Sequence, residues 1–168
     1  MRSLPRLIER AVVNSGPLVA LSLLGQLELL PALYAECWVP QTVYNEVAVA
    51  GIGKPGASSL QAADWQARVR SGPVPDPLLV MELDAGEAEV ISLARHLSPC
   101  MAIIDERRGR RIAQQVYGLP VKGTAGILVE AYRLGLISAV RPRLLELRAA
   151  GYFIADSVID AASHAVGE

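Results

Sequence analysis

Short apolar runs alternate with segments of helical periodicity along most of the chain. Residues 11–13 and 37–39 have the length and composition of buried strands, the second of them ending at Pro40. Each is followed by helical spacing, over residues 17–24 and 41–50 respectively. Because strands that alternate with helices usually pair in parallel, this order favours a parallel sheet covered by helices.

The second half of the chain continues this order with longer helical segments. The predicted elements are a helix over 86–97, a strand over 101–104, a basic helix from 107 to 117, a strand over 119–122 and a helix over 124–134. Two amphipathic helices then flank a short extended segment at residues 152–154. The predicted fold is therefore a three-layer α/β/α sandwich with a mostly parallel central sheet.

Length and composition agree with one folded unit. The chain has 168 residues, of which 52% are hydrophobic, and a chain of about 150 residues buries roughly 70% of its unfolded surface. We predict a single domain over residues 1–168, with an N-terminal extension at 1–10. The Gly, Pro and Ser content of residues 51–59 is typical of a flexible loop. The stretch from this loop to Pro77 shows no clear pattern.

Charge and cysteine content limit the partners and the compartment. Lys and Arg number 16 against 17 Asp and Glu, so contact with nucleic acid has to come from a local basic patch. Cys37 and Cys100 lack metal-type spacing, and two thiols in this chain indicate a reducing compartment, which predicts a cytoplasmic protein. Glu9 and Asn14 interrupt a signal-like start. No run reaches the roughly 18 apolar residues of a membrane span.

Polar residues end two of the predicted strands. Asn14 follows the first strand and Asp105 follows the strand at 101–104. Ligands of open parallel sheets bind outside the carboxyl ends of the strands, so both residues are candidates for a functional site. The alternative is a helix cap: Asn14 or Ser15 for the helix with Pro17 in its first turn, and Asp105 for the helix that begins near residue 107.

Two glutamates add carboxylates to this set. Glu87 shares the apolar helix face of Val90 and Ile91, whereas Glu89 points roughly the other way. An ionised carboxylate on an apolar face is costly unless it is paired or binds a cation. Glu46 lies at the edge of another apolar stripe, where by itself it is typical of an ordinary exposed glutamate.

A basic block directly follows Asp105. At helical spacing Arg107, Arg110 and Arg111 share one face of the helix, whereas Arg108 points elsewhere. The arginines on the shared face could position RNA phosphates without reading the RNA sequence. The alternative is a solvated face. Thr124, between two glycines, could cap its own helix. The remaining expectations are helix-surface positions for His96 and His164 and core positions for Trp38 and Trp65.

Five ordered segments carry a resemblance to a known family. They are VVNSGPLVALSLLGQLELL, VPQTVYNEV, LDAGEAEVISLA, AIIDERRGRRIA and GLPVKGTAGILVEAYRLGLI. With these segments in order, the chain resembles a PIN domain, and the resemblance extends from Val12 to about Ala162. In particular it is similar to the uncharacterised bacterial and archaeal branch related to toxin nucleases of the VapC type.

The resemblance implies a Mg²⁺- or Mn²⁺-dependent endoribonuclease. The acidic cluster of the family falls on Asn14, Glu46, Glu87 and Asp105, with the hydroxyls of Ser15 and Thr124 nearby. Hard divalent ions prefer oxygen ligands, and Mg²⁺ takes only one or two carboxylates directly. Asp105 and Glu87 would then be ligands, and Glu46 would hold or deprotonate the attacking water. The implied partners are an RNA substrate, a small antitoxin protein and a second copy of the chain in a homodimer.

Asn14 departs from the family pattern, which has an aspartate at this position. An amide oxygen can coordinate a cation but carries no charge, so four carboxylates become three. A natural protein with reduced or lost activity, a site that works with one metal, and a deliberate replacement all agree with this residue. The alternative function is a catalytically inactive PIN-fold module that binds RNA or protein.

Overall fold

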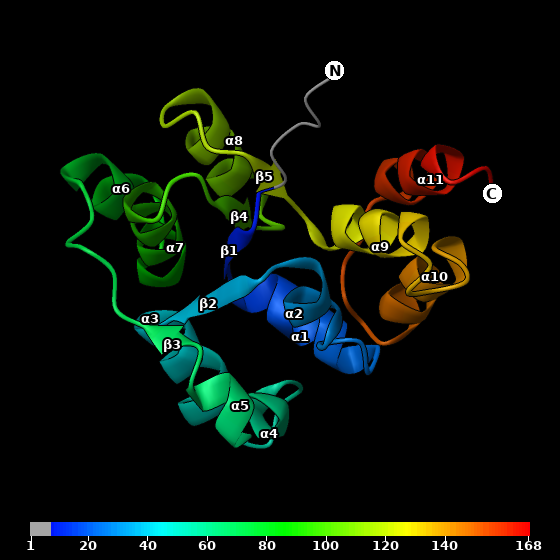
Figure 1. Ribbon diagram of the computed structural model, residues 1–168, viewed down its shortest axis with the longest axis horizontal. Helices are drawn as coiled ribbons and strands as arrows, with labels where there is room; N and C mark the ends of the chain where they lie inside the picture. Colours follow the sequence, from blue (N-terminus) through cyan, green and yellow to red (C-terminus); the bar gives the residue numbers. More distant parts are fainter. Residues whose placement is uncertain (1–7) are drawn as a thin grey trace.

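A five-stranded parallel sheet forms the centre of the part of the chain that the computed structural model describes, residues 8–168 (Figure 1). Its strands are β1 (Arg10–Val13), β2 (Glu36–Pro40), β3 (Val69–Arg70), β4 (Met101–Ile103) and β5 (Val121–Lys122). The strand order is β3-β2-β1-β4-β5, so β1 is central. Its Ala11 is aligned with Cys37 on one side and with Met101 on the other.

Helices cover both faces of this sheet. The first half of the chain forms α1 (Ser15–Leu23), α2 (Leu29–Leu33), α3 (Gln41–Tyr44), a π-helical turn η1 (Asn45–Val49), α4 (Ala57–Leu60), α5 (Ala63–Gln66) and α6 (Pro77–Glu82). The second half forms α7 (Ala85–His96), α8 (Arg107–Gln115), α9 (Thr124–Arg133), α10 (Arg141–Ala149) and α11 (Asp156–Ala165). Helix α7 packs against β1, β2 and β4, whereas α1 and α2 pack with α9 (Figure 1). The predicted three-layer α/β/α sandwich is confirmed.

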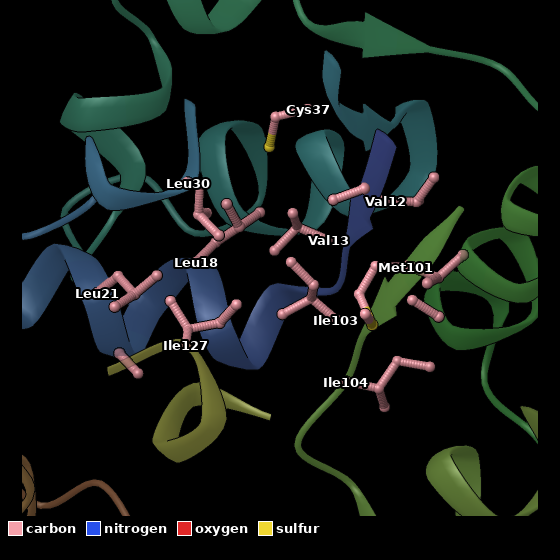
Figure 2. Close-up of a cluster of buried hydrophobic side chains, with 14 of the residues drawn as sticks. Val12, Val13, Leu18, Leu21, Leu30, Cys37, Met101, Ile103, Ile104 and Ile127 are labelled. Carbon is pink, nitrogen blue, oxygen red and sulfur yellow. The ribbon is translucent and has the colours of Figure 1, made fainter. Parts of the chain in front are cut away.

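The core lies where the central strands meet these helices. Val13 of β1, Ile103 of β4, Leu18 of α1 and Ile127 of α9 are fully buried on one face of the sheet, whereas Val12, also fully buried, points to the opposite face (Figure 2). Apolar burial of this kind stabilises by about 25 cal/mol per Å² removed from water, which explains why the short apolar runs become the central strands.

Tertiary packing changes the segment boundaries in several places. The predicted loop at 51–59 contains the start of α4, because Ala57 and Leu60 are buried in the core. The unassigned stretch after it forms α5, β3 and α6, and β3 has only two residues, too few for a periodicity. The predicted helix over 41–50 is divided into α3 and η1. These elements depend on distant contacts that local composition does not encode.

The predicted N-terminal extension at 1–10 lies mostly outside the described residues, as does the beginning of the signal-like start, because the described part of the chain starts at residue 8. The last position of the predicted extension, Arg10, is the first residue of β1 and pairs with Glu36 of β2. In the described part of the chain, none of the helices has the length and apolarity that crossing a bilayer requires.

Side chains without a proposed chemical role mostly lie as expected. His96 and His164 are exposed on helices α7 and α11. Trp65 is buried, as predicted. Trp38 is only partly buried at the edge of the core, and the Arg70 guanidinium lies over its ring, 5.2 Å from the centroid. Cys37 and Cys100 are free thiols.

Candidate active site

Asn14 and Asp105 follow the carboxyl ends of two neighbouring strands. The backbone N–H of Asn14 donates to the carbonyl of Ile103 at 3.0 Å, which continues the pairing of β1 with β4 past the last residue of the strand. The Asn14 side chain is 4% exposed and forms no capping hydrogen bond with α1. Asn14 is thus the N-cap residue of α1 by its backbone position, but its amide makes no capping hydrogen bond. Ser15, the first residue of α1, is half-buried beside it.

Asp105 binds the start of α9 rather than the start of α8. Its Oδ1 accepts the backbone N–H of Thr124 at 2.7 Å, and its Oδ2 accepts the Thr124 hydroxyl at 2.6 Å. The Tyr152 hydroxyl, from the segment between α10 and α11, donates to the same Oδ2. The N-cap of α8 is Glu106 and that of α9 is Gly123, so neither Asp105 nor Thr124 caps its own helix as the sequence had allowed.

Two glycines allow these groups to approach. A Cβ at Gly123 would lie 2.7 Å from Asp105 Oδ1 and 2.6 Å from Arg110 Nη1, so the carboxylate and the guanidinium both lie against this backbone position. A Cβ at Gly16, near the start of α1, would lie 2.9 Å from the Tyr152 hydroxyl. The absence of side chains at both positions is what lets α1, α8, α9 and the 152 segment converge on Asp105.

Gly123→Ala is therefore expected to lower the free energy of unfolding by about 1–3 kcal/mol, because a new methyl group meets a carboxylate that Thr124 and Tyr152 hold in place. The matched control is Gly126→Ala, inside α9, where the new Cβ would be 3.6 Å or more from Lys122. That control should raise stability by up to about 1 kcal/mol through helix propensity. Urea unfolding measures both; equal effects would contradict the close packing at Gly123.

Glu87 lies buried at the start of α7, as its place on the apolar face predicted. It is 9% exposed, and its backbone N–H donates to Oδ1 of Asp84, the N-cap residue, at 2.8 Å. A Cβ at Gly109 of α8 would lie 2.8 Å from Glu87 Oε2. Glu46 is exposed, and its Oε2 would be 3.5 Å from a Cβ at Gly86, the neighbour of Glu87.

Burial and the neighbouring acids raise the pKa of Glu87. Burial raises the pKa of the Glu87 carboxyl to about 8, with further contributions from the Asp84 side chain and from the charges of Glu106 and Glu46. The carboxyl therefore keeps a proton near neutral pH. A cation at this position would oppose the same repulsion.

The raised pKa of Glu87 predicts that the folded protein loses stability with rising pH. Between the ordinary glutamate value of 4.5 and about 8, the folded state holds a proton that the unfolded state has released, so the free energy of unfolding falls across this window. In chelator the loss attributable to Glu87 should be up to roughly 5 kcal/mol across this window, since one pKa unit corresponds to about 1.4 kcal/mol. Glu87→Gln should remove this part of the slope, whereas Glu89→Gln, on the same helix, should keep it. Urea titrations from pH 5 to 9 test this; identical slopes for all three proteins would contradict it.

The basic block divides as predicted, with one arginine apart from the rest. Arg108 forms an ion pair with Glu82 of α6. Arg110 is half-buried beside Gly123, and Arg107 and Arg111 are exposed. Within residues 8–168, none of these three guanidinium groups lies within 4 Å of a carboxylate oxygen. Of these three, Arg110 lies next to Asp105, because both side chains lie against Gly123.

Sequence reasoning missed Tyr152 and Asp84. Tyr152 is 47 residues from Asp105 along the chain, and an aromatic residue in a short extended segment has no local signature of a site residue. The Asp84 signal was present, because an aspartate that precedes a helix by one position is a common N-cap. Glu89, set apart from Glu87 by its spacing, does bind elsewhere: its Oε2 accepts both the hydroxyl and the backbone N–H of Thr42.

The fold and these side chains define a class of protein. An all-parallel α/β/α sandwich carries an amide, a carboxylate and arginines where β1 and β4 end, with further acids at the start of α7. The family model for the PIN domain matches residues 10–168, so the chain belongs to the PIN domain family. PIN domains are generally metal-dependent nucleases. No curated protein and no solved structure matches the chain.

The oxygen donors at this end of the sheet fit a divalent cation that retains most of its water. Within residues 8–168 no group of three or more His, Cys, Asp or Glu side chains is arranged to hold a metal ion. Mg²⁺ commonly takes only one or two carboxylates, however, and keeps several waters. Asp105 supplies a carboxylate, Asn14 a buried amide without a capping role, and Glu87 a crowded acid whose proton a cation could replace.

Proposed function

We propose that this chain is a metal-dependent endoribonuclease and the toxin of a toxin-antitoxin pair, with activity reduced by the neutral amide of Asn14. The observation that carries the proposal is the position of Asp105. Its carboxylate follows β4 next to the end of β1, and both this carboxylate and the Arg110 guanidinium lie against Gly123. A carboxylate beside an unpaired arginine suits a phosphodiester substrate, because the carboxylate can hold a cation and the guanidinium can bind a phosphate.

Each residue has a role in this proposal. Asp105 and Glu87 would hold Mg²⁺ or Mn²⁺, with the Asn14 amide oxygen as a neutral ligand. Glu46, the exposed acid, would accept a proton from the attacking water. When bound, the cation would lower the pKa of a coordinated water and neutralise charge on the phosphate.

The substrate contacts would come from hydroxyls and guanidinium groups around Asp105. Arg110 would bind the phosphate next to the site, and the exposed arginines of α8 would follow the RNA backbone, which positions a nucleic acid without reading its sequence. The proposed contact residues are Ser15, Arg107, Arg108, Arg110, Arg111 and Thr124. Arg108 would first have to leave Glu82, an exposed pair that costs little to break.

A nuclease assay tests this function. The chain is incubated with a mixed pool of single-stranded RNA in Mn²⁺, in Mg²⁺ or in EDTA, and the products are separated by size. We expect internal cleavage that depends on the cation. The absence of cleavage by both this chain and Asn14→Asp under all conditions would contradict a nuclease.

A catalytically inactive binding module is the second candidate. It is favoured by the neutral amide at Asn14 and by the three hydrogen bonds that Asp105 already accepts. In this case RNA would bind without cleavage, which fluorescence anisotropy with labelled RNA in EDTA and in Mn²⁺ would detect.

The proposed protein partners are a small antitoxin and a second copy of the chain. Val74, Val80 and Met81, in and before α6, are 91%, 63% and 81% exposed. Apolar side chains gathered on a surface mark protein interfaces. The free, buried thiols of Cys37 and Cys100 suit a reducing compartment, and we propose the cytoplasm.

A further inference from the structure

Asp105 is nearly saturated by donors from its own chain. A carboxylate offers about four acceptor positions, two on each oxygen. Oδ2 accepts hydrogen bonds from the Thr124 hydroxyl and from the Tyr152 hydroxyl, and Oδ1 accepts one from the backbone of Thr124. One position on Oδ1 remains. A cation that binds Oδ2 has to displace one of these hydroxyl groups.

The two donors to Oδ2 differ in how easily they can leave. Thr124 is 2% exposed and is the first residue of α9, and its backbone N–H also binds Asp105. Tyr152 is half-buried in the irregular segment between α10 and α11 and follows Gly151, whose φ is +91°. The Tyr152 contact can therefore open without unwinding a helix.

Space for such a movement exists next to the tyrosine. A cavity of about 540 Å³ is lined by Arg148, by Tyr152 itself and by the segment from Gly151 to Asp156. Arg148 anchors the far side of this segment, because it donates to the carbonyl of Ile154 at 3.1 Å and to Oδ1 of Asp156 at 2.6 Å. The side chain can turn into the cavity while these contacts hold the backbone.

The hydroxyl of Tyr152 also lies against the start of α1. A Cβ at Gly16 would lie 2.9 Å from this hydroxyl and 3.8 Å from Oδ2 of Asp105. The phenol is therefore packed between the start of α1 and Asp105.

We propose that Tyr152 is an intramolecular competitor for the cation: its hydroxyl closes Oδ2 of Asp105 in the resting protein, and cation binding at this oxygen requires the side chain to turn away. The inference rests on the proposed role of Asp105 as a metal ligand. The neutral amide of Asn14 favours the state in which Tyr152 is bound to Asp105. It adds no negative charge that would attract the cation and help it to displace the Tyr152 hydroxyl.

The test is Mn²⁺ binding by isothermal titration calorimetry to the full chain without RNA. Tyr152→Phe removes the hydroxyl and keeps the ring, and its dissociation constant should be about tenfold lower, the value of one hydrogen bond to a charged acceptor. The matched control is Tyr117→Phe, which also removes a hydroxyl that donates to a carboxylate, in this case Oδ2 of Asp76 at 3.2 Å. The control should bind Mn²⁺ as the parent chain does.

The melting temperature in EDTA supplies the second readout. Both a competitor and a merely structural tyrosine predict a lower melting temperature for Tyr152→Phe, but only a competitor predicts tighter Mn²⁺ binding. Suppose that Tyr152→Phe binds Mn²⁺ no more tightly than the parent chain, and that the parent chain cleaves RNA in Mn²⁺. This result would overturn the proposed role of Tyr152 and leave the proposed nuclease function standing. Absence of Mn²⁺ binding and of RNA cleavage in both proteins would overturn the competitor and the nuclease together.

Discussion

Asp105→Ala is expected to abolish detectable RNA cleavage and to lower the free energy of unfolding by about 2–3 kcal/mol. Removing residues that only support a metal ligand costs about 10–100-fold in affinity or activity, so loss of a direct ligand should cost at least about 100-fold. The stability loss follows from the three donors at Thr124 and Tyr152, which lose a charged acceptor. Cleavage of an RNA pool in Mn²⁺ and urea unfolding measure the two effects.

A control separates lost chemistry from lost stability. Leu144→Ala removes a fully buried side chain of α10 and should cost about 2–5 kcal/mol without changing the donors to Asp105. At a temperature where both variants are folded, only Asp105→Ala should be inactive. Cleavage by folded Asp105→Ala at the parent rate would mean that the site lies elsewhere.

Asn14→Asp is expected to tighten Mn²⁺ binding about fivefold or more and to increase RNA cleavage. The new charge lies a few ångströms from the proposed cation, which at an effective dielectric near 20 is worth a few kcal/mol before desolvation. A net gain of about 1 kcal/mol already gives roughly fivefold. Because Asn14 is 4% exposed, the added carboxylate should also lower stability in EDTA, and Mn²⁺ should restore it.

The fold should tolerate this substitution. The Asn14 side chain makes no capping bond, and its backbone N–H bond to Ile103 does not depend on the side chain. Gln115→Glu, an equal change of amide to carboxylate at an exposed position of α8, is the control and should leave Mn²⁺ affinity unchanged. If Asn14→Asp and the parent chain bind Mn²⁺ and cleave RNA equally, and Asp105→Ala removes both properties, then the amide at position 14 is not a ligand.

Much of the candidate site could be predicted from the sequence, because one rule used for it is local, the spacing of residues along a helix. The other, the position of residues at strand ends, depends only on topology. Helical spacing put Glu87 on the buried face of α7, where it lies. The strand-end rule put Asn14 and Asp105 at the same edge of the sheet, and the pairing of β1 with β4 makes them neighbours. Neither rule requires knowledge of loop paths or side-chain partners.

The partners of these residues could not be predicted, because each depends on how distant segments pack. The alternative role for Asp105 was a cap for α8, the helix next to it, yet the carboxylate binds the start of α9, whose first residue is 19 positions away. The end of the predicted loop at 51–59 is helical, because α4 begins at Ala57 and both Ala57 and Leu60 are buried.

The sequence by itself determined the parallel sandwich and the acids at its edge, since apolar periodicity and strand order act over short stretches of chain. Only the tertiary structure decided that Thr124 and Tyr152 donate to Asp105 and that Gly16 and Gly123 make room for them. It also decided that burial, with the neighbouring acids, raises the pKa of Glu87. These properties arise from distances between groups up to 47 residues apart, which no local pattern records.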